Sequence, residues 1–235
     1  MRDIISIAAG IWIGLAGTVM AQSTAENPVV VELYTSQGCS SCPPADKVLQ
    51  GLAKRDDVIA LALHVDYWDY IGWKDSFADP GYSDRQRAYA RFAGARTVYT
   101  PQMIVGGMDH LVGVRTAELE ALVKRHGAAD TPVRITLQRQ GGKVRINAQS
   151  KAALPDDCLV QLVRYRPLEQ VTIERGENAG KVLDYANIVT DWRRIAKWNG
   201  RSPLAVTADA AGSDALAVII QEPGPGRILA AARLQ

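Results

Sequence analysis

The amino-acid sequence predicts an α/β domain followed by a small all-β, sandwich-like domain. Two apolar, β-branched segments, residues 29–34 and 58–65, flank a stretch with helical periodicity. From residue 131 onward, apolar and polar residues alternate in short runs that are separated by turn residues. With 235 residues, of which 47% are hydrophobic, the chain is long enough to bury two modest cores.

The N-terminus is predicted to be a secretory signal peptide that covers residues 1–21. Arg2 precedes an apolar run over residues 4–19, and residues 19–21 offer small or tolerated side chains at a cleavage site. The alternative is an uncleaved membrane anchor, because the apolar run falls only slightly short of the ~20 residues that a membrane-spanning helix needs. We therefore expect a periplasmic or secreted protein that has no membrane attachment after cleavage.

The charge balance and the cysteine count narrow the function classes. The chain carries 27 Lys and Arg against 25 Asp and Glu, a net charge of +2, which favours neither nucleic acid nor anionic lipid as a partner. Three cysteines are too few for a disulfide scaffold. Two of them lie three positions apart, a spacing that suits redox or metal chemistry better than cross-linking.

The first domain, expected over residues 27–128, begins with the strand at residues 29–34 and a turn that leads into two cysteines. The helix that follows has its apolar residues on one face, and two prolines are tolerated in its first turn. These apolar residues are Ala45, Val48, Leu49, Leu52 and Ala53. The segment 58–65 resembles a central strand covered on both faces, so that strand, helix and strand form a right-handed βαβ unit.

Turn and capping signals predict the rest of this domain. A long aromatic and acidic loop covers residues 66–82, and residues 83–86 have the pattern of a capping box at the start of a helix. Two short strands at residues 102–105 and 110–114 and a helix that begins at Thr116 complete the α/β layout.

The β-rich domain, expected over residues 130–235, begins with a half-exposed antiparallel hairpin. Apolar and polar residues alternate at 133–137 and 144–148, on either side of two glycines. Six further apolar runs, separated by turn residues, are strand candidates. They cover residues 159–165, 171–173, 182–189, 204–208, 216–221 and 228–234. Together these strands indicate a small sandwich.

The cysteine pair, Cys39 and Cys42, lies where the first strand is followed by a helix. A helix N-terminus offers unpaired N–H groups and a partial positive charge, which favour a thiolate over a thiol. Cys39 is therefore predicted to be the attacking nucleophile. Cys42, one turn further along, is placed to attack the mixed disulfide that Cys39 forms with a partner.

Two alternatives to redox catalysis stay open. The two cysteines, with His64 or Asp66, could bind copper or another soft metal without turnover. The chain has no second CxxC and no His-x3-His pattern to complete a zinc site, so we expect neither a resident metal nor another cofactor. The protein could also be a redox-inert scaffold that binds a protein partner through its sandwich.

His64 and Asp66 are candidates for proton transfer to and from Cys42. They lie at the carboxyl end of the predicted central strand, the edge at which α/β proteins gather their sites. The alternative is that this aromatic and acidic loop only covers the sheet.

Three segments are similar to a bacterial family of exported thioredoxin-like proteins that is catalogued as a domain of unknown function. They are VVELYTSQGCSSCPPAD (residues 30–46), HVDYWDY (64–70) and YTPQ (99–102). The resemblance continues through GENAG (176–180) and WNG (198–200), so it spans nearly all of the mature chain.

The resemblance implies a thioredoxin-like fold for the α/β domain and a cis-proline, Pro101, that packs beside the CxxC. It also implies that Thr100 presents its backbone groups to a substrate segment, while Pro101 lacks an N–H group that could compete at the sulfurs. Thr100 and Pro101 are thus candidate substrate-binding residues.

The sequence therefore predicts an exported thiol-disulfide oxidoreductase that acts by dithiol-disulfide exchange. Its partners would be a protein thiol or disulfide and a second redox partner that recharges the cysteine pair. The direction of the exchange depends on the reduction potential, which the residues between the cysteines do not specify.

Overall fold

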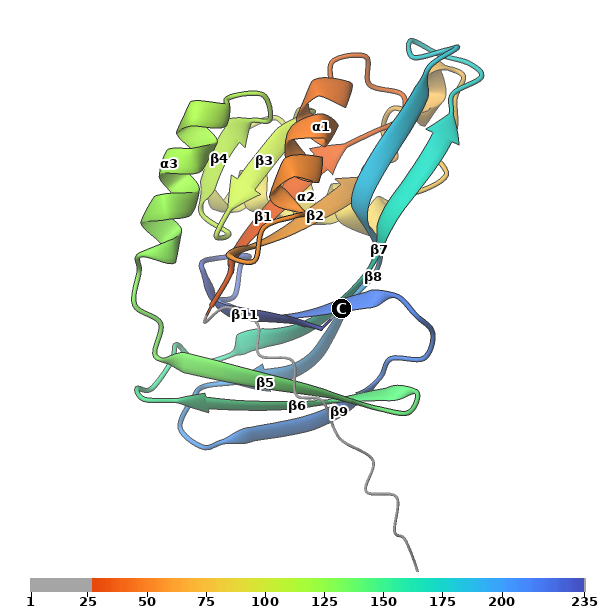
Figure 1. The fold of residues 1–235 in the computed structure, drawn as a ribbon. Helices are drawn as coiled ribbons and strands as arrows, with labels where there is room; N and C mark the ends of the chain where they lie inside the picture. Colours follow the sequence, from red (N-terminus) through yellow and green to blue (C-terminus); the bar gives the residue numbers. More distant parts are fainter. Residues whose placement is uncertain (1–26, 235) are drawn as a thin grey trace, which may run out of the picture.

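The computed structural model describes residues 27–234, which form two β-sheets and three α-helices (Figure 1). The predicted signal peptide, residues 1–21, lies outside the described residues. The first half of the chain contains β1 (Val29–Thr35), α1 (Pro43–Leu52), β2 (Val58–His64), the 3-10 helix η1 (Asp69–Ile71), α2 (Pro80–Phe92), β3 (Gln102–Val105), β4 (Asp109–Val112) and α3 (Thr116–Gly127). The second half contains β5 (Val133–Gln140), β6 (Lys143–Ser150), β7 (Cys158–Thr172), β8 (Val182–Trp198), β9 (Leu204–Asp209), β10 (Ala215–Gln221) and β11 (Ile228–Leu234).

One large mixed sheet runs through both halves of the chain, in the order β11-β10-β7-β8-β2-β1-β3-β4. At its centre β1 and β2 are parallel, and all seven residues of each strand are buried. β8 joins β2 in parallel through the pair Ala62 and Ile188. The smaller sheet has the order β5-β6-β9.

The predicted fold class, an α/β thioredoxin-like domain followed by a small all-β sandwich-like domain, is wrong. The described residues 27–234 are mostly β, and four strands of the second half extend the sheet that the first half begins. Alternation of apolar and polar residues shows that a segment is a strand, but it does not show which strand it pairs with. The domain bounds 27–128 and 130–235 stay a prediction.

Three apolar cores hold the layers together. α1 and α3 cover one face of the β1 half of the large sheet, and α2 covers the opposite face. The small sheet packs on the other half, as seen in the lower part of Figure 1. A strand between two cores must send successive side chains to opposite faces, and β10 does so. Val218 and Ile220 face the small sheet, while Ala217 and Ile219 face the core under α2.

β7 and β8 form a long hairpin whose tip extends beyond the sheet. Their pairing runs from Cys158 opposite Trp198 to Thr172 opposite Val182. The segments expected as separate strands before and after residue 170 are one strand, β7. In Figure 1 the hairpin rises beside α1, where the Gln50 side-chain amide donates to the carbonyl oxygen of Asp184 at 2.6 Å.

The start of α2 differs from the capping box predicted at residues 83–86. The helix begins at Pro80, and the carboxylate of Asp79 accepts a hydrogen bond from the N–H of Gly81 at 2.7 Å. A proline at the first helical position costs no hydrogen bond, so Asp79 and Pro80 make a better N-terminus than Ser83.

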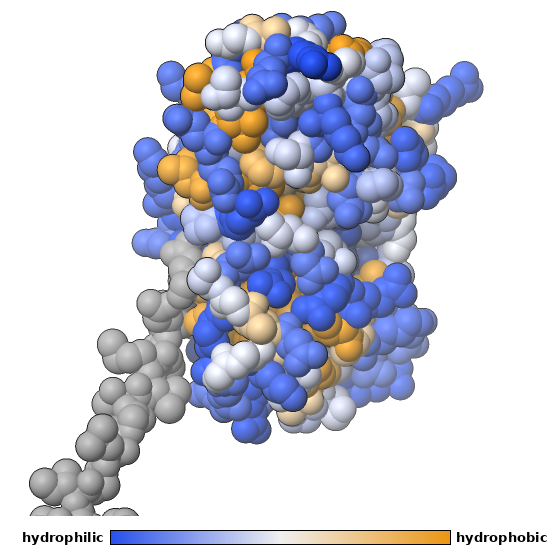
Figure 2. Space-filling model, turned by 90° about the vertical axis from the view of Figure 1, so that its right-hand side faces the viewer, coloured by the Kyte–Doolittle hydropathy of each residue, from blue (hydrophilic) through white to orange (hydrophobic). Residues whose placement is uncertain are grey.

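The surface in Figure 2 is mainly hydrophilic, with apolar side chains in small groups. Among residues 27–234, no helix combines the length and the apolar character needed to cross a membrane.

Candidate functional site

Cys39 and Cys42 form a disulfide between the end of β1 and the start of α1, with their Cα atoms 5.4 Å apart. Both are buried, with 1% and 0% of their surface exposed, whereas the intervening Ser40 and Ser41 are exposed. The disulfide therefore lies directly under the surface turn that its own loop forms.

The first turn of α1 differs from the one that the sequence suggested. Its first two residues, Pro43 and Pro44, have no N–H group, and the N–H groups of Ala45 and Asp46 both donate to the carbonyl oxygen of Cys42. The expected unpaired amides are thus missing from these four positions. Stabilisation of a Cys39 thiolate falls to the helix dipole and to the hydroxyl of Ser41, whose Oγ lies 3.4 Å from the Cys39 sulfur.

The loop between β2 and α2 supports the turn that precedes Cys39. The backbone N–H of Gln37 donates to the Asp75 carboxylate at 2.8 Å, and the indole N–H of Trp73 donates to the side-chain oxygen of Gln37 at 2.8 Å. The sequence predicts that this loop either covers the sheet or borders the site. Two of its side chains fix the conformation of the CxxC turn.

The tip of the β7–β8 hairpin closes over the same turn. The buried side-chain amide of Asn178 donates to the carbonyl oxygens of Gln37 and Cys39, at 2.9 and 3.0 Å. The backbone N–H of Ser40 donates to the Glu177 carboxylate at 3.3 Å. Glu177 and Asn178 lie in the segment 176–180, whose sequence carries a family resemblance but no signal of this contact with the CxxC turn.

Thr100 and Pro101 reach the start of α1 from a third direction. Their peptide bond is cis, and Pro101 is buried. A Cβ atom added to Gly113 would lie 2.8 Å from the Cβ of Ala45 and 3.2 Å from the Cβ of Pro101, so the proline is next to the first turn of α1. The indole N–H of Trp68 donates to the Thr100 hydroxyl at 2.8 Å.

The two candidates for proton transfer have different surroundings. His64 is fully buried; its Nδ1 lies 2.8 Å from the Asp75 carboxylate, and its ring packs edge-on against Phe77 and Tyr185. Asp66 instead accepts a hydrogen bond from the hydroxyl of Ser83 on α2 at 2.5 Å. The structure thus brings His64, but not Asp66, into the buried space under α1.

Two further carboxylates lie in that buried space. Burial raises the pKa of Asp46 to about 7, although the charge of His64 and a hydrogen bond from Thr35 lower it. Burial alone would raise the pKa of Asp75 too, but the charge and hydrogen bond of His64 and the N–H groups of Gln37 and Phe77 outweigh it and hold this pKa below its ordinary value. Asp46 was missed, although an acidic residue three positions before Leu49 on the apolar helix face was a visible signal.

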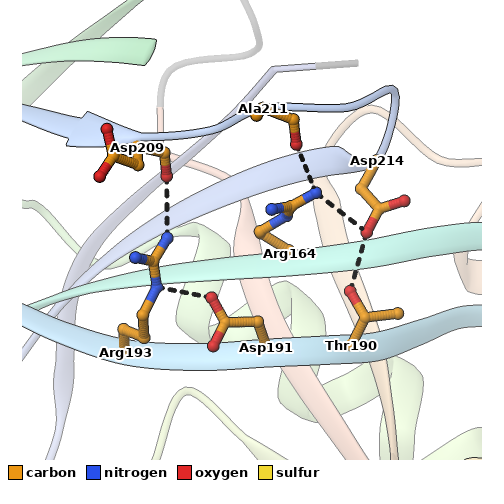
Figure 3. A pocket seen from close by; sticks show the side chains of 7 residues that line it. All are labelled: Arg164, Thr190, Asp191, Arg193, Asp209, Ala211 and Asp214. Carbon is orange, nitrogen blue, oxygen red and sulfur yellow. Dashed lines mark hydrogen bonds and ion pairs between the residues drawn. The ribbon is translucent and has the colours of Figure 1, made fainter. Parts of the chain in front are cut away.

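The described residues contain no group of three or more His, Cys, Asp or Glu side chains that could hold a metal ion. A cavity of about 500 Å³ lies elsewhere, among strands β7 to β10 (Figure 3). Its two arginines are both ion-paired, because Arg164 lies 3.5 Å from the Asp214 carboxylate and Arg193 lies 2.6 Å from the Asp191 carboxylate. It offers no free charge for an anion.

The family of the chain follows from a match over most of its length. Residues 30–221 match the family described as "Protein of unknown function (DUF1223)". The chain belongs to the DUF1223 family.

Two solved structures resemble this DUF1223 protein. A crystal structure of a protein from Agrobacterium tumefaciens is 33% identical, with a TM-score of 0.77 over 90% of this chain and 96% of the other. HBP35 of Porphyromonas gingivalis is 13% identical, with a TM-score of 0.63 over 91% of this chain and 76% of the other, and shares the fold alone. No curated protein matches the sequence.

Proposed function

We propose that this DUF1223 protein is an exported thiol-disulfide oxidoreductase that exchanges disulfides with protein partners through Cys39 and Cys42. The observation that carries the proposal is the Cys39–Cys42 disulfide at the start of α1, with Pro101 beside the same helical turn. A disulfide across so short a loop constrains the unfolded chain very little, so stabilisation does not account for it.

Cys39 acts as the nucleophile because the positive end of the α1 dipole and the hydroxyl of Ser41 favour its thiolate. Cys42, fully buried at the residue before α1, displaces the partner from the mixed disulfide. A second redox partner restores the starting state of the pair.

Thr100 and Pro101 hold the partner's segment beside the disulfide. The backbone of Thr100 pairs with an extended segment, and Pro101 keeps a competing N–H group away from the sulfurs. Trp68 orients Thr100 through its indole N–H, and its ring stacks on that of Tyr70, which is 81% exposed. We propose that the kinship with thioredoxin-like proteins lies in this pairing of CxxC and cis-proline rather than in the sheet as a whole.

The burial of both sulfurs favours one rival, a redox-inert scaffold in which the disulfide never opens. The reduction potential separates the two, measured on the mature chain in glutathione buffers. Catalytic pairs have potentials of about -270 to -120 mV, whereas inert structural disulfides lie below about -300 mV. We expect a value in the catalytic range, and a value in the structural range would establish the scaffold.

Trapping in the periplasm tests the assignment of roles. Cys42→Ala should leave Cys39 joined to its natural partner, as a band on a non-reducing gel that disappears on reduction. Cys39→Ala is the matched control and should capture nothing. Capture by Cys39→Ala alone would reverse the two roles, and capture by neither variant would argue against dithiol exchange.

A further inference from the structure

Four buried side chains under α1 have polar atoms without a hydrogen-bond partner among the described residues. They are Thr35 (Oγ1), Asp46 (both carboxylate oxygens), His64 (Nε2) and Tyr185 (the hydroxyl), and we call them the open cluster. Within it, the Thr35 hydroxyl still interacts with the Asp46 carboxylate as a weak hydrogen bond, which lowers the pKa of Asp46. Each side chain belongs to a residue that is at least nine-tenths buried. An unpartnered buried polar atom lowers stability, so several at one place require a physical reason.

The four residues come from four elements that meet at one place. Thr35 of β1 lies opposite His64 of β2 in the sheet. The rings of His64 and Tyr185 of β8 have centroids 5.0 Å apart. Asp46 of α1 interacts electrostatically with both His64 and Tyr185.

Asp46 also belongs to the same turn of α1 as the second cysteine. It follows Cys42 by four positions, and its N–H donates to the carbonyl oxygen of Cys42 at 3.1 Å. Side chains four positions apart on a helix are neighbours on one face. The buried side chains of Cys42 and Asp46 therefore lie one turn apart on the same face of α1.

On the basis of the proposed function, we propose that Asp46 is the proton acceptor and donor for Cys42, and that His64, held by Asp75, positions and tunes it. When the protein is oxidised, the Cys42 thiol gives its proton to the Asp46 carboxylate. The Cys42 thiolate attacks the Cys39 sulfur of the mixed disulfide, the Cys39–Cys42 bond forms, and the partner leaves as a thiolate with the electron pair of the broken bond.

The reverse reaction uses the same proton. A partner thiolate attacks Cys39, the Cys39–Cys42 bond breaks, and Cys42 leaves as a thiolate that takes the proton from the Asp46 carboxyl. Without such a donor, a fully buried thiolate would have to form at Cys42 without compensation, which is costly.

The surroundings of Asp46 suit this exchange near neutral pH. The titratable groups that interact with it are His64 from β2, Asp75 from the loop before α2 and Tyr185 from β8. Cys42 lies one turn before it on the same helix. Burial raises the pKa of Asp46 to about 7, and burial with the nearby carboxylates of Asp46 and Asp75 keeps the pKa of Tyr185 above its ordinary value. An acid-base group works best when its pKa is close to the working pH.

The two steps can be separated with dithionitrobenzoate as the probe. Mixing it with the reduced protein releases one thionitrobenzoate when Cys39 is modified and a second when Cys42 closes the disulfide. Asp46→Asn should slow the second release on the order of 100-fold at about pH 7, the typical scale of acid-base assistance, and leave the first within about twofold. Asp84→Asn, at an exposed aspartate on α2, is the matched control and should change neither phase.

The outcomes distinguish this inference from the proposed function. If the wild-type protein gives no second release, the dithiol exchange itself fails. If the wild type gives both phases and Asp46→Asn closes the disulfide at the wild-type rate, Asp46 is not the proton acceptor and the proposed function stands.

The wild-type pH profile gives a test that needs no folded Asp46 variant. The rate of the second release should rise through an inflection near the pKa of Asp46, about 7, before the ordinary thiol range is reached. His64→Gln should move that inflection, which a merely structural role for His64 would leave in place. A profile with no inflection below about pH 8 in the wild type would overturn the proposal.

Discussion

Two buried polar clusters lie on opposite faces of the same central strands, and they differ in how completely their atoms are paired. On the α2 face, the Glu32 carboxylate accepts two hydrogen bonds from Arg85, at 2.7 and 2.8 Å, and one from Tyr89 at 2.6 Å. Gln221 donates to the Tyr89 hydroxyl, and Tyr34 donates to Glu32. We call these five residues the paired cluster.

The open cluster on the α1 face has the same burial without the same pairing. Thr35 adjoins the disulfide turn on β1, three positions from Glu32, yet among residues 27–234 its hydroxyl has only a weak interaction with the Asp46 carboxylate. A fully satisfied buried network stiffens a fold, whereas an incompletely satisfied one lowers stability and persists where it serves another purpose. The comparison agrees with a structural role for the paired cluster and with the proton transfer that we propose for the open cluster.

Arg85→Met should give the largest effect, because it would break the paired cluster. It leaves the Glu32 carboxylate buried without its counter-ion and should lower the free energy of unfolding by about 3–5 kcal/mol, measured by urea denaturation. Arg87→Met, on the same helix but 44% exposed at its side chain, is the control and should change the stability by less than about 1 kcal/mol. Equal losses in the two variants would show that the paired cluster is not a stability element.

Asp46→Asn should have the next largest effect, which is a change in how the free energy of unfolding depends on pH. The pKa of Asp46 is about 7 in the folded protein against 3.8 for an unperturbed aspartate, so between these values the folded state binds more protons than the unfolded state. Stability then falls as pH rises through this window, by at most about 1.4 kcal/mol per pH unit and roughly 4 kcal/mol over the whole window. Asn cannot ionise, so the variant should lose this fall.

Asp75 should change stability with pH in the opposite direction to Asp46, so it provides an internal comparison for the stability measurement. Its pKa is lowered in the folded protein, so its contribution is present above the unperturbed value of 3.8 and is lost as the pH falls through the folded value. Urea titrations at several pH values should separate the two windows. A wild-type stability that stays level or rises between about pH 4.5 and 7 would contradict the buried, neutral state of Asp46.

The contrast between the clusters also shows how far sequence reasoning reaches in this chain. Apolar periodicity located β1, β2, α1 and the strands of the second half, because each element buries one face or two. It did not reveal that β8 adds to β2, since one parallel pair between Ala62 and Ile188 leaves no pattern in either segment.

The same limit applies to the polar residues of the site. Cys39 and Cys42 were found because their spacing is itself a signal. Glu32 and Asp46 were overlooked, because single acidic residues within apolar patterns reveal nothing of the partners that they have or lack across the fold. Asn178 lies more than 130 positions from Cys39, and only the fold brings its side chain to that carbonyl group.

Asn178→Ala sharpens the comparison at the hairpin tip, with a smaller expected effect. It removes two hydrogen bonds from a buried amide to the CxxC turn and should lower the free energy of unfolding by about 1–2 kcal/mol. Loosening of the tip should also speed reduction of the Cys39–Cys42 disulfide by dithiothreitol. Asn147→Ala on β6 is the control, and an unchanged rate of reduction in Asn178→Ala would show that the tip does not restrict access.

The smallest expected effect concerns the charge of Glu177, whose exposed carboxylate accepts a hydrogen bond from the N–H of Ser40, the residue after Cys39. A negative charge beside the nucleophile disfavours the thiolate, and solvent and salt weaken this influence at an exposed site. Glu177→Gln should therefore raise the rate of alkylation of reduced Cys39 by iodoacetamide only about twofold at low salt, in a Cys42→Ser background, and less at high salt. Glu174→Gln, at an exposed glutamate in the same loop, should leave the rate unchanged. A rise of equal size in both variants would assign the effect to net charge, whereas a rise confined to Glu177→Gln would show that the hairpin tip tunes the nucleophile as well as covering it.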